Sequence, residues 1–410
     1  MTTVARMRGN LARIGVAAVL ATALSTGVAS AGQPALDPVA LQASLTKLHE
    51  AGMPAVYAAV RDGKQHWQGA AGVSEVDTED TRVPARANFE HRIGSVTKPM
   101  IATAVLQLVA AKKIALDGPI GDYLPENVPG DLGRRVSVRM LLNHTSGIAD
   151  FVAALFPKPE DIEANRLRDF DSASLVRTAL PLPPTGAPGE RWSYSNTNYL
   201  ILGLLLTKVT KADFREYVER NVLRPAGMER TYFPRKETKI RGPHAKAYEE
   251  LYGAFVPPKD FSVYKMTWAD AAGEIIAPMA DVVAFHKALQ SGKLLAPAQL
   301  AEMKRTVPIL APNGTKVGEY GLGLNVYALP CGRIWGHDGA VWGMGTFSGS
   351  TEDGGRQLSV GTNLMKYQRI GSDGTLKPHP TIDPAYLDVI TKAACGSSTP
   401  SPASAPRTTG

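Results

Sequence analysis

Hydrophobic and polar positions form two different patterns near the start of the chain. Residues 41–51 repeat apolar side chains at helical spacing, whereas residues 55–60 form a short apolar run that the polar turn 61–64 follows. An apolar run bounded by a turn is typical of a strand. Residues 67–73 can form the strand that returns, so this part of the chain predicts one helix and two paired strands.

The rest of the chain predicts a helical middle and then a return to strands. Apolar spacing is helical from Pro99 to about Lys112. Residues 105 to 265 then alternate helical stretches with proline- and glycine-rich breaks, of which 181–189 is the longest. Such breaks end helices because proline lacks an N–H and glycine has no Cβ. Short strands are expected at 332–336, 344–350 and 358–362.

These elements predict an α/β fold in which helices flank a sheet that both ends of the chain build. We expect a discontinuous α/β domain from residues 32–104 and 270–396, with an all-α domain inserted at 105–269. Ligand sites commonly lie in clefts between domains, so we expect the site between these two domains. Residues 397–410 mix Ser, Thr, Pro and Ala with few large apolar side chains, which predicts a flexible tail.

Residues 1–31 have the character of a secretory signal peptide. Three arginines precede an apolar run from Ile14, and Ala29-Ser30-Ala31 supplies an Ala-x-Ala cleavage site. A membrane anchor is the alternative, but it needs about 18 or more strongly apolar residues, and Thr and Ser dilute this run. The sequence therefore predicts a secreted protein without a stable membrane anchor.

Charge and cysteine content restrict the classes of partner. The formal net charge is +7, and the three signal arginines account for three of these charges, which leaves +4 without any dense basic run. Nucleic-acid binding is therefore not expected. Cys331 and Cys395 are the only cysteines. In an exported chain such a pair favours a disulfide over a metal site, because two thiols alone are too few metal ligands. We expect no cofactor.

Three short motifs carry the candidate chemistry. Ser95 and Lys98 stand at i and i+3, which on a helix places both on one face. Tyr194-Ser195-Asn196 places a phenol and an amide two residues apart, and His337-Asp338-Gly339 follows later. A serine hydroxyl needs a neighbouring base and donors aimed at the developing oxyanion. The three motifs together could supply an activated serine for acyl transfer.

The order of the motifs is more specific than any one of them. Ser-x-x-Lys also occurs at Ser44/Lys47 and Ser262/Lys265, and Lys316-Val317-Gly318 fits the looser Lys/His-x-Gly form. Tyr-x-Asn occurs once, at Tyr194. The motifs are separated by about one hundred and then about one hundred and forty residues. Order and spacing together make coincidence a poor explanation.

With these motifs the chain resembles the active-site-serine penicillin-recognising enzymes. It is most similar to the branch of secreted soluble D-alanyl-D-alanine carboxypeptidases, class C β-lactamases, D-stereospecific amidohydrolases and related esterases. The class A enzymes have Ser-Asp-Asn and Lys-Thr-Gly where this chain has Tyr-Ser-Asn and His-Asp-Gly. The likeness runs from about residue 38 to about 396 and includes 141–147, 271–276 and 320–324. It implies an antiparallel sheet flanked by helices.

The resemblance implies a role for each motif residue. Ser95 would be the acylated nucleophile, and Lys98 would keep the Tyr194 phenolate accessible. Tyr194 would deprotonate Ser95, pass the proton to the leaving group and later activate water. His337 would adjust the protonation around Tyr194. The alternatives are a helix N-cap for Ser95, a core tyrosine beside a turn for Tyr194 and a structural histidine for His337.

Substrate contacts follow from the same resemblance. Asn196 would donate to the substrate carbonyl, although it could also be a turn residue. The oxyanion hole would use the backbone N–H groups of Ser95 and of Ala340, the residue directly after Gly339 of the third motif. The aromatic residues that could line the pocket, or could instead be core, are Trp192, Phe151, Trp268 and Trp342.

The sequence departs from the carboxypeptidase pattern where those enzymes hold a terminal carboxylate. An arginine and two threonines of that pattern are replaced by Asn325, Asp338 and Ala340. A carboxylate at Asp338 would repel a substrate carboxylate and would suit an ammonium, unless it points to solvent. We therefore expect a serine hydrolase or acyltransferase for D-amino-acid peptides, amides or esters. Peptidoglycan is a candidate partner, and β-lactams are candidate inhibitors.

Three other functions stay open at this point. One is a strict D-alanyl-D-alanine carboxypeptidase or β-lactamase-like enzyme, and another is a carboxylesterase. The third is a non-catalytic peptidoglycan-binding protein, although loss of catalysis usually breaks a motif and all three are intact. Activity on short acyl esters without activity on D-amino-acid derivatives would identify the carboxylesterase.

Overall fold

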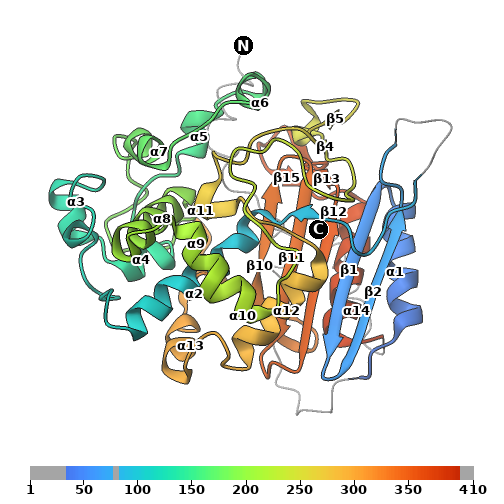
Figure 1. Cartoon of the computed structure of the whole chain (residues 1–410). Coiled ribbons are helices and arrows are strands. Elements are labelled where there is room, and N and C mark those ends of the chain that lie inside the picture. Colours follow the sequence, from blue (N-terminus) through green and yellow to red (C-terminus); the bar gives the residue numbers. More distant parts are fainter. Residues whose placement is uncertain (1–33, 77–82, 398–410) are drawn as a thin grey trace.

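A large antiparallel sheet organises the fold, and both ends of the chain build it (Figure 1). The computed structural model describes residues 34–76 and 83–397. Within these residues the sheet has eight strands, and every neighbouring pair is antiparallel. Their spatial order is β2 (Gln65–Gly72), β1 (Ala55–Asp62), β12 (Arg356–Thr362), β11 (Met344–Thr351), β10 (Gly332–Val341), β9 (Asn325–Leu329), β8 (Lys316–Tyr320) and β7 (Val307–Leu310).

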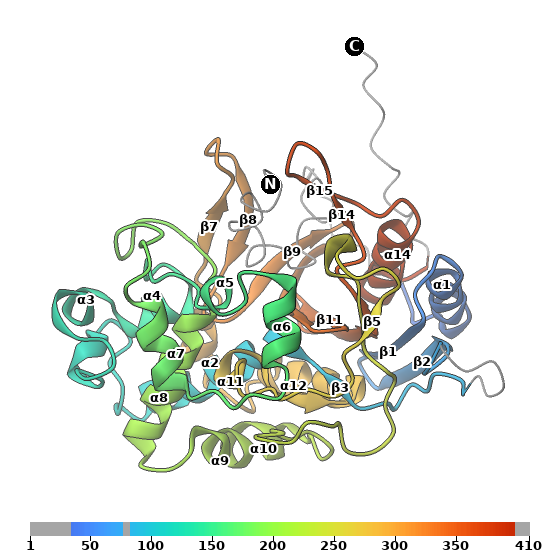
Figure 2. The same cartoon turned by 90° about the horizontal axis from the view of Figure 1, so that it is seen from above.

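The central strands are apolar on both faces because helices cover both sides of the sheet. Val56 and Val60 of β1 pack with α1 (Pro38–Glu50) and α14 (Ile382–Cys395). Tyr57, which points to the other face, joins the core that contains α2 (Thr97–Ala110) and α12 (Met279–Gln290). Figure 2 shows the two pairs of helices on opposite sides of the sheet. The predicted fold class, an antiparallel sheet flanked by helices, is confirmed.

Helices fill the middle of the chain beside the sheet (Figure 1). The central one is α8 (Asn196–Thr210), which is apolar almost all round and buried. It starts after the extended residue Ser195 and ends at Thr210, before Lys211 in the left-handed conformation. The others are α3 (Gly130–Arg135), α4 (Val138–Leu142), α5 (Val152–Leu155), α6 (Pro159–Asn165), α7 (Ser172–Ala179), α9 (Phe214–Val218), α10 (Arg224–Ala226), α11 (Asp270–Gly273) and α13 (Pro297–Met303).

Short strands complete the connections between the large elements. These strands pair outside the main sheet. They are β3 (His91–Arg92) with β6 (Ile276–Ala277), β4 (Tyr248–Glu249) with β5 (Lys259–Asp260) and β13 (Leu364–Met365), and β14 (Arg369–Ile370) with β15 (Leu376–Lys377). The pair β3 and β6 matters for the site, because it fixes the segment after α11 beside the segment before α2.

The predicted local elements agree well with those observed. The helix expected at 41–51 is α1, and the two N-terminal strands are β1 and β2. The three later strands fall within β10, β11 and β12. The strands β7, β8 and β9 were not individually predicted. The division into two domains stays a prediction, since one apolar core joins β1 to helices of the middle segment.

Cys331 and Cys395 form a disulfide that links the turn before β10 to the last residue of α14. The predicted signal peptide lies outside the described residues, as does the predicted tail apart from Ser397. Among the described helices, none combines the length and apolar character that a membrane-spanning segment requires.

Candidate active site

The start of α2 brings Ser95 and Lys98 together. Ser95 lies in a single helical turn, Gly94–Val96, and Lys98 lies in the first turn of α2. The Lys98 Nζ donates a hydrogen bond of 2.9 Å to the Ser95 Oγ. Lys98 is fully buried. A spacing of three residues therefore places the Lys98 amine within hydrogen-bond distance of the Ser95 hydroxyl, as local helix geometry predicts.

The Ser95 turn packs directly against β10, with backbone on backbone. Gly94 has a φ of +56°, and a Cβ on it would lie 2.9 Å from the Ala340 N. A Cβ on Gly339 would overlap the Ile93 carbonyl oxygen and lie 3.3 Å from the Ser95 N. Glycine is required at both positions because no side chain fits between the segments. The Ser95 and Ala340 amides consequently lie at the same junction.

Tyr194 reaches Ser95 from the segment before α8. Its hydroxyl donates a hydrogen bond of 2.7 Å to the Ser95 Oγ. The ring centre lies 4.5 Å from the ring centre of His144, which also accepts from the Ser195 N at 3.3 Å. His144 is fully buried and has a φ of +60°, which non-glycine residues adopt only when surrounding contacts require it. His144 thus holds the Tyr194 segment in place.

Lys98 has two further partners besides the serine. It donates to the Asn196 Oδ1 at 2.9 Å and to the Ala272 carbonyl oxygen at 2.7 Å. The Asn196 Nδ2 donates in turn to the Asp150 Oδ2 at 2.9 Å. One of the two amide N–H groups of Asn196 is therefore already engaged. The Asn196 side chain therefore links the Lys98 amine to the Asp150 carboxylate, which no sequence motif identified.

Burial shifts the proton affinities of the amine and the phenol in opposite directions. Desolvation lowers the pKa of Lys98 to about 7, although Asp150 and Asp338 oppose this shift. Desolvation raises the pKa of Tyr194 well above its ordinary value, and the hydrogen bond to Ser95 opposes that shift. Near neutral pH Lys98 can therefore be present as the neutral amine, while the Tyr194 phenol retains its proton.

His337 lies on β10 and faces the same cluster without a hydrogen bond to Tyr194. Its Nε2 lies 2.9 Å from the Tyr320 hydroxyl, and its Nδ1 lies 2.5 Å from the Asp338 carbonyl oxygen. Because a carbonyl only accepts, Nδ1 carries the proton and Nε2 accepts from Tyr320. The two rings of His337 and Tyr194 are 6.3 Å apart. Burial lowers the pKa of His337 to about 4, so the ring is neutral at neutral pH.

Asp338 and Asn325 lie beside the cluster on β10 and β9. Asp338 is 9% exposed, and its Oδ1 accepts a hydrogen bond of 2.6 Å from the Tyr327 hydroxyl. Asn325 is 8% exposed and accepts from the Val326 N at 3.0 Å through its Oδ1. The Asp338 carboxylate is therefore partly buried rather than directed fully into solvent. One of its oxygens already has a partner inside the protein.

A protein-family model described as Beta-lactamase matches residues 41–373, which is more than half of the chain. The chain belongs to the beta-lactamase family. Its fold is that of β-lactamase-like serine hydrolases, and the family resemblance that the motifs indicated is confirmed.

Solved structures support the membership of this beta-lactamase family protein. It is similar to a D-stereospecific amidohydrolase from Streptomyces sp., with 32% identity, a TM-score of 0.75 and coverage of 88% of this chain and 100% of that chain. It shares the fold of a D-amino acid amidase from Ochrobactrum anthropi SV3, with 23% identity, a TM-score of 0.73 and coverage of 87% and 97%.

A curated relative extends the comparison to an esterase. Esterase EstB from Burkholderia gladioli is 33% identical over 181 residues, which is 42% of this chain and 45% of the esterase. The chain spans less than two thirds of the length of the first curated relatives that it matches.

The four aromatic residues proposed as pocket walls occupy different surroundings in this beta-lactamase family member. Trp192 packs near the Tyr194 and Tyr320 rings, at 6.3 and 5.9 Å. Trp268 and Trp342 lie 5.4 Å apart, in a cluster with Phe156. Phe151 is fully buried in the main core, so this residue has no surface that a substrate could contact.

Sequence reasoning missed several residues that complete the cluster, although signals for them existed. Asp150 follows the stretch 141–147 by three residues, and Ala272 and Tyr320 lie inside the stretches 271–276 and 320–324. Those stretches were recognised as supporting segments but no role was given to their side chains or carbonyls. Tyr327, the partner of Asp338, had no signal in the sequence, because its strand β9 was not predicted.

Proposed function

We propose that this protein is a secreted active-site-serine hydrolase or acyltransferase that forms an acyl-enzyme at Ser95 on D-amino-acid peptides, amides or esters. The observation that carries the proposal is the position of the Ser95 Oγ, which lies 2.9 Å from the Lys98 Nζ and 2.7 Å from the Tyr194 hydroxyl oxygen. The similarity to a D-stereospecific amidohydrolase supports the substrate class.

Lys98 acts as the first proton acceptor in this proposal. In its neutral form Lys98 has two N–H groups, and the Asn196 Oδ1 and the Ala272 carbonyl can only accept them. The remaining lone pair is then directed to Ser95. This assignment revises the sequence-based hypothesis that Tyr194 deprotonates Ser95, because the pKa of Tyr194 lies well above its ordinary value. Tyr194 keeps its proton until the leaving group needs it.

The reaction then proceeds as two acyl transfers. The Ser95 Oγ attacks the substrate carbonyl, its proton moves to Lys98, and the Ser95 and Ala340 amides receive the oxyanion. Tyr194 donates its proton to the leaving amine or alcohol and recovers one from Lys98. In the second transfer Tyr194 passes its proton to Lys98 and takes the proton of the water molecule or acceptor amine that attacks the ester, and Lys98 returns its proton to the departing Ser95 Oγ. Microscopic reversibility requires the same groups in both steps.

The other functions are weaker alternatives for stated reasons. A strict D-alanyl-D-alanine carboxypeptidase would place the substrate carboxylate near Asp338, where like charges repel. A carboxylesterase has support from the similarity to EstB, over 42% of this chain. A non-catalytic peptidoglycan-binding protein would not need the polar cluster around Ser95. We propose peptidoglycan fragments as one source of substrate and β-lactams as acylating inhibitors.

Labelling of Ser95 tests the proposal. A fluorophosphonate or a β-lactam is expected to form one covalent adduct per chain, which peptide mass spectrometry should locate at Ser95. The Ser95→Ala variant is the matched control and should remain unlabelled with unchanged circular dichroism. An adduct at Ser262, or an unlabelled but folded protein, would contradict the assignment. A parallel assay of D- and L-aminoacyl esters and amides against diacyl-Lys-D-Ala-D-Ala separates the substrate classes.

Asp338 should select substrates that carry a free amino group. A charged hydrogen bond in a partly desolvated site is worth about 1.5–3 kcal/mol, or roughly ten- to a hundredfold in kcat/KM. Asp338→Asn is therefore expected to lower kcat/KM for D-aminoacyl esters by that factor and to spare their N-acetylated counterparts. The measurement is kcat/KM for both substrates of each pair.

Two comparisons decide whether Asp338 has this role. Asp338→Thr restores the residue of the carboxypeptidase pattern and should shift preference partly toward substrates with a free carboxylate, since Asn325 still replaces the arginine. Equal losses on amino and N-acetyl substrates after Asp338→Asn would instead assign the carboxylate to the hydrogen bond with Tyr327 alone.

A further inference from the structure

The short helix α11 connects the catalytic cluster to an ion-pair network on another side of the molecule. Its Ala272 carbonyl accepts the 2.7 Å hydrogen bond from the Lys98 Nζ. A Cβ on Gly273 would lie 3.4 Å from the Gly94 carbonyl carbon, so α11 also packs on the turn that holds Ser95. A displacement of α11 would therefore alter both Lys98 and the Ser95 turn.

Arg215 of α9 bridges the two ends of α11. Its Nε donates to the Glu274 Oε1 at 2.5 Å, and its Nη2 donates to the Asp270 Oδ2 at 2.7 Å. Glu274 follows the last residue of α11, and Asp270 is the first. The side chains of Arg215, Asp270 and Glu274 are 14%, 12% and 0% exposed. One planar guanidinium thus fixes both termini of the helix.

α11 depends on such contacts because it is not stable by itself. Four residues form too few hydrogen bonds to offset the entropy of ordering them. Asp270 has a φ of +39°, a conformation that a non-glycine residue keeps only when neighbouring contacts impose it. α11 also packs closely on α8, because a Cβ on Gly203 of α8 would lie 2.8 Å from the Ala271 Cβ. Arg215 supplies the polar restraint.

We propose that Arg215 is a positioning residue for the catalytic amine: through Asp270 and Glu274 it holds α11 so that the Ala272 carbonyl stays on the Lys98 Nζ. This proposal rests on the proposed role of Lys98 as the proton acceptor. Arg215 touches neither Ser95 nor the bound substrate in this scheme, and it acts through the position of one carbonyl.

The Ala272 carbonyl matters because it stabilises the charged form of Lys98. A hydrogen bond to the ammonium favours the ammonium and raises the pKa of the amine, against the effect of burial. Loss of the carbonyl should therefore lower the pKa of Lys98 further. The other groups that face the amine, and that the test leaves in place, are Asn196, Asp150, Asp338, Tyr194, Tyr199, His144 and His337.

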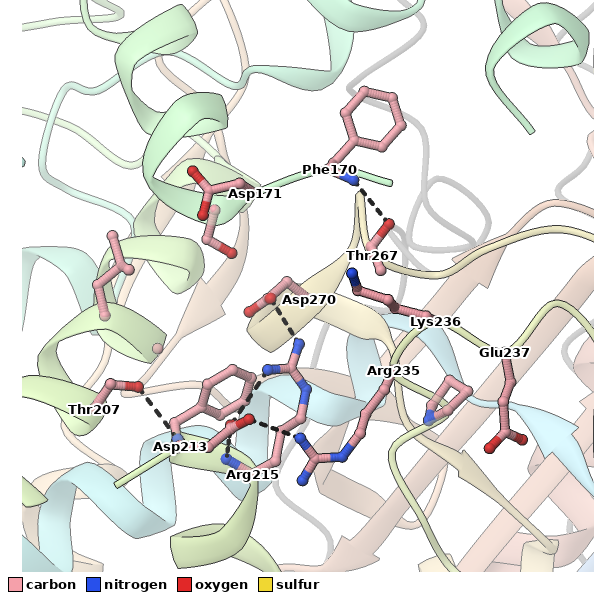
Figure 3. Close-up of a pocket in the computed structure, with 15 residues that line it drawn as sticks. Phe170, Asp171, Thr207, Asp213, Arg215, Arg235, Lys236, Glu237, Thr267 and Asp270 are labelled. Atoms are coloured by element: carbon pink, nitrogen blue, oxygen red, sulfur yellow. Dashed lines mark hydrogen bonds and ion pairs between the residues drawn. The ribbon is translucent and has the colours of Figure 1, made fainter. Parts of the chain in front are cut away.

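A surface groove makes the network experimentally accessible. The groove has a volume of about 940 Å³, and Phe170, Asp213, Arg215, Arg235 and Asp270 are among its lining residues (Figure 3). None of the three motifs contributes to its lining, so the groove is distinct from the catalytic cluster. Arg235 donates to Asp213 at 2.7 Å and is 47% exposed. It lines the same groove as Arg215 without a hydrogen bond to α11, which makes it a matched control.

The test compares Arg215→Ala with Arg235→Ala across pH. In the wild type the rate of Ser95 labelling by a fluorophosphonate should rise with pH as Lys98 becomes neutral. Arg215→Ala is expected to lower the rate at high pH by about tenfold and to move the midpoint about one pH unit lower. Ethylguanidine should restore rate and midpoint, because the groove can admit it to the vacated site. If Arg215→Ala folds poorly, Arg215→Lys serves instead. It keeps the charge but lacks the planar guanidinium that reaches both carboxylates, so its labelling rate and midpoint should be intermediate.

Each outcome bears on the proposal. Arg235→Ala should retain the wild-type rate and midpoint and should not respond to ethylguanidine. An unchanged or raised midpoint in Arg215→Ala, or equal effects of the two variants, would overturn the positioning role. If the wild-type protein is labelled at Ser95 but turns over no D-aminoacyl substrate, only the substrate class of the proposed function fails, and the Arg215 comparison can still be read.

Discussion

Replacing Lys98 by alanine is expected to lower kcat/KM for ester hydrolysis by a factor of about 10² to 10⁴, the usual contribution of a positioned general base. The variant removes the only amine within hydrogen-bond distance of the Ser95 Oγ among the described residues. Tyr194→Phe should lower kcat/KM by a comparable factor, because it removes the 2.7 Å hydrogen bond and the proton for the leaving group. Steady-state kinetics on one activated D-aminoacyl ester measures both.

The double variant tests whether the two residues act on the same proton. Lys98→Ala combined with Tyr194→Phe should cost little more than the worse single variant, because each step of the relay needs both groups. Losses that add fully in free energy would show independent contributions.

The wild-type kcat/KM should rise with pH through about 7, since burial lowers the pKa of Lys98 to that value and only the neutral amine accepts a proton. Tyr194→Phe should retain this rise.

Gly339→Ala should nearly abolish activity through the backbone alone. The added Cβ would overlap the Ile93 carbonyl oxygen, so β10 and the Ser95 turn must move apart. The Ala340 amide would then move away from the proposed oxyanion, and loss of one such donor typically costs about 10² to 10³ in kcat. Turnover of the ester and thermal unfolding should be measured together, because the same overlap also lowers the free energy of unfolding.

Gly318→Ala provides the control for this substitution. Gly318 lies on β8 of the same sheet, and a Cβ there would lie 3.2 Å from the flexible end of Ile309. This variant should retain wild-type kcat. Wild-type turnover by folded Gly339→Ala would remove the oxyanion role from the junction between Ser95 and β10.

Local features of the sequence were sufficient to predict the core of the site. Ser95 and Lys98 are three residues apart on a helix, so their contact depends only on helix geometry. The same is true of α1, whose apolar side chains recur at a helical period, and of β1, whose short apolar run is bounded by a turn. Tyr194 was found because its motif stands at a characteristic distance from Ser95 in the family that the chain resembles.

The rest of the site depends on contacts between distant segments. The Ala272 carbonyl lies 174 residues beyond Lys98, and Arg215 reaches α11 from another helix. Backbone acceptors have no side-chain signature, and a short helix such as α11 has too few residues to show a period. The hydrogen bond between Tyr327 and Asp338 likewise requires the pairing of β9 with β10. These partners became visible only in the folded chain.

The sequence by itself determined the family, the fold class and the helical spacing that brings Ser95 and Lys98 together, because motif order, apolar patterns and short spacings carry this information directly. Only the tertiary structure decided the direction in which the pKa of the amine and the pKa of the phenol shift. A lysine or a tyrosine has its ordinary pKa until folding removes it from water, and desolvation then lowers the pKa of Lys98 and raises that of Tyr194. Desolvation is a property of packing between α2, α8 and β10, so no motif could have assigned it.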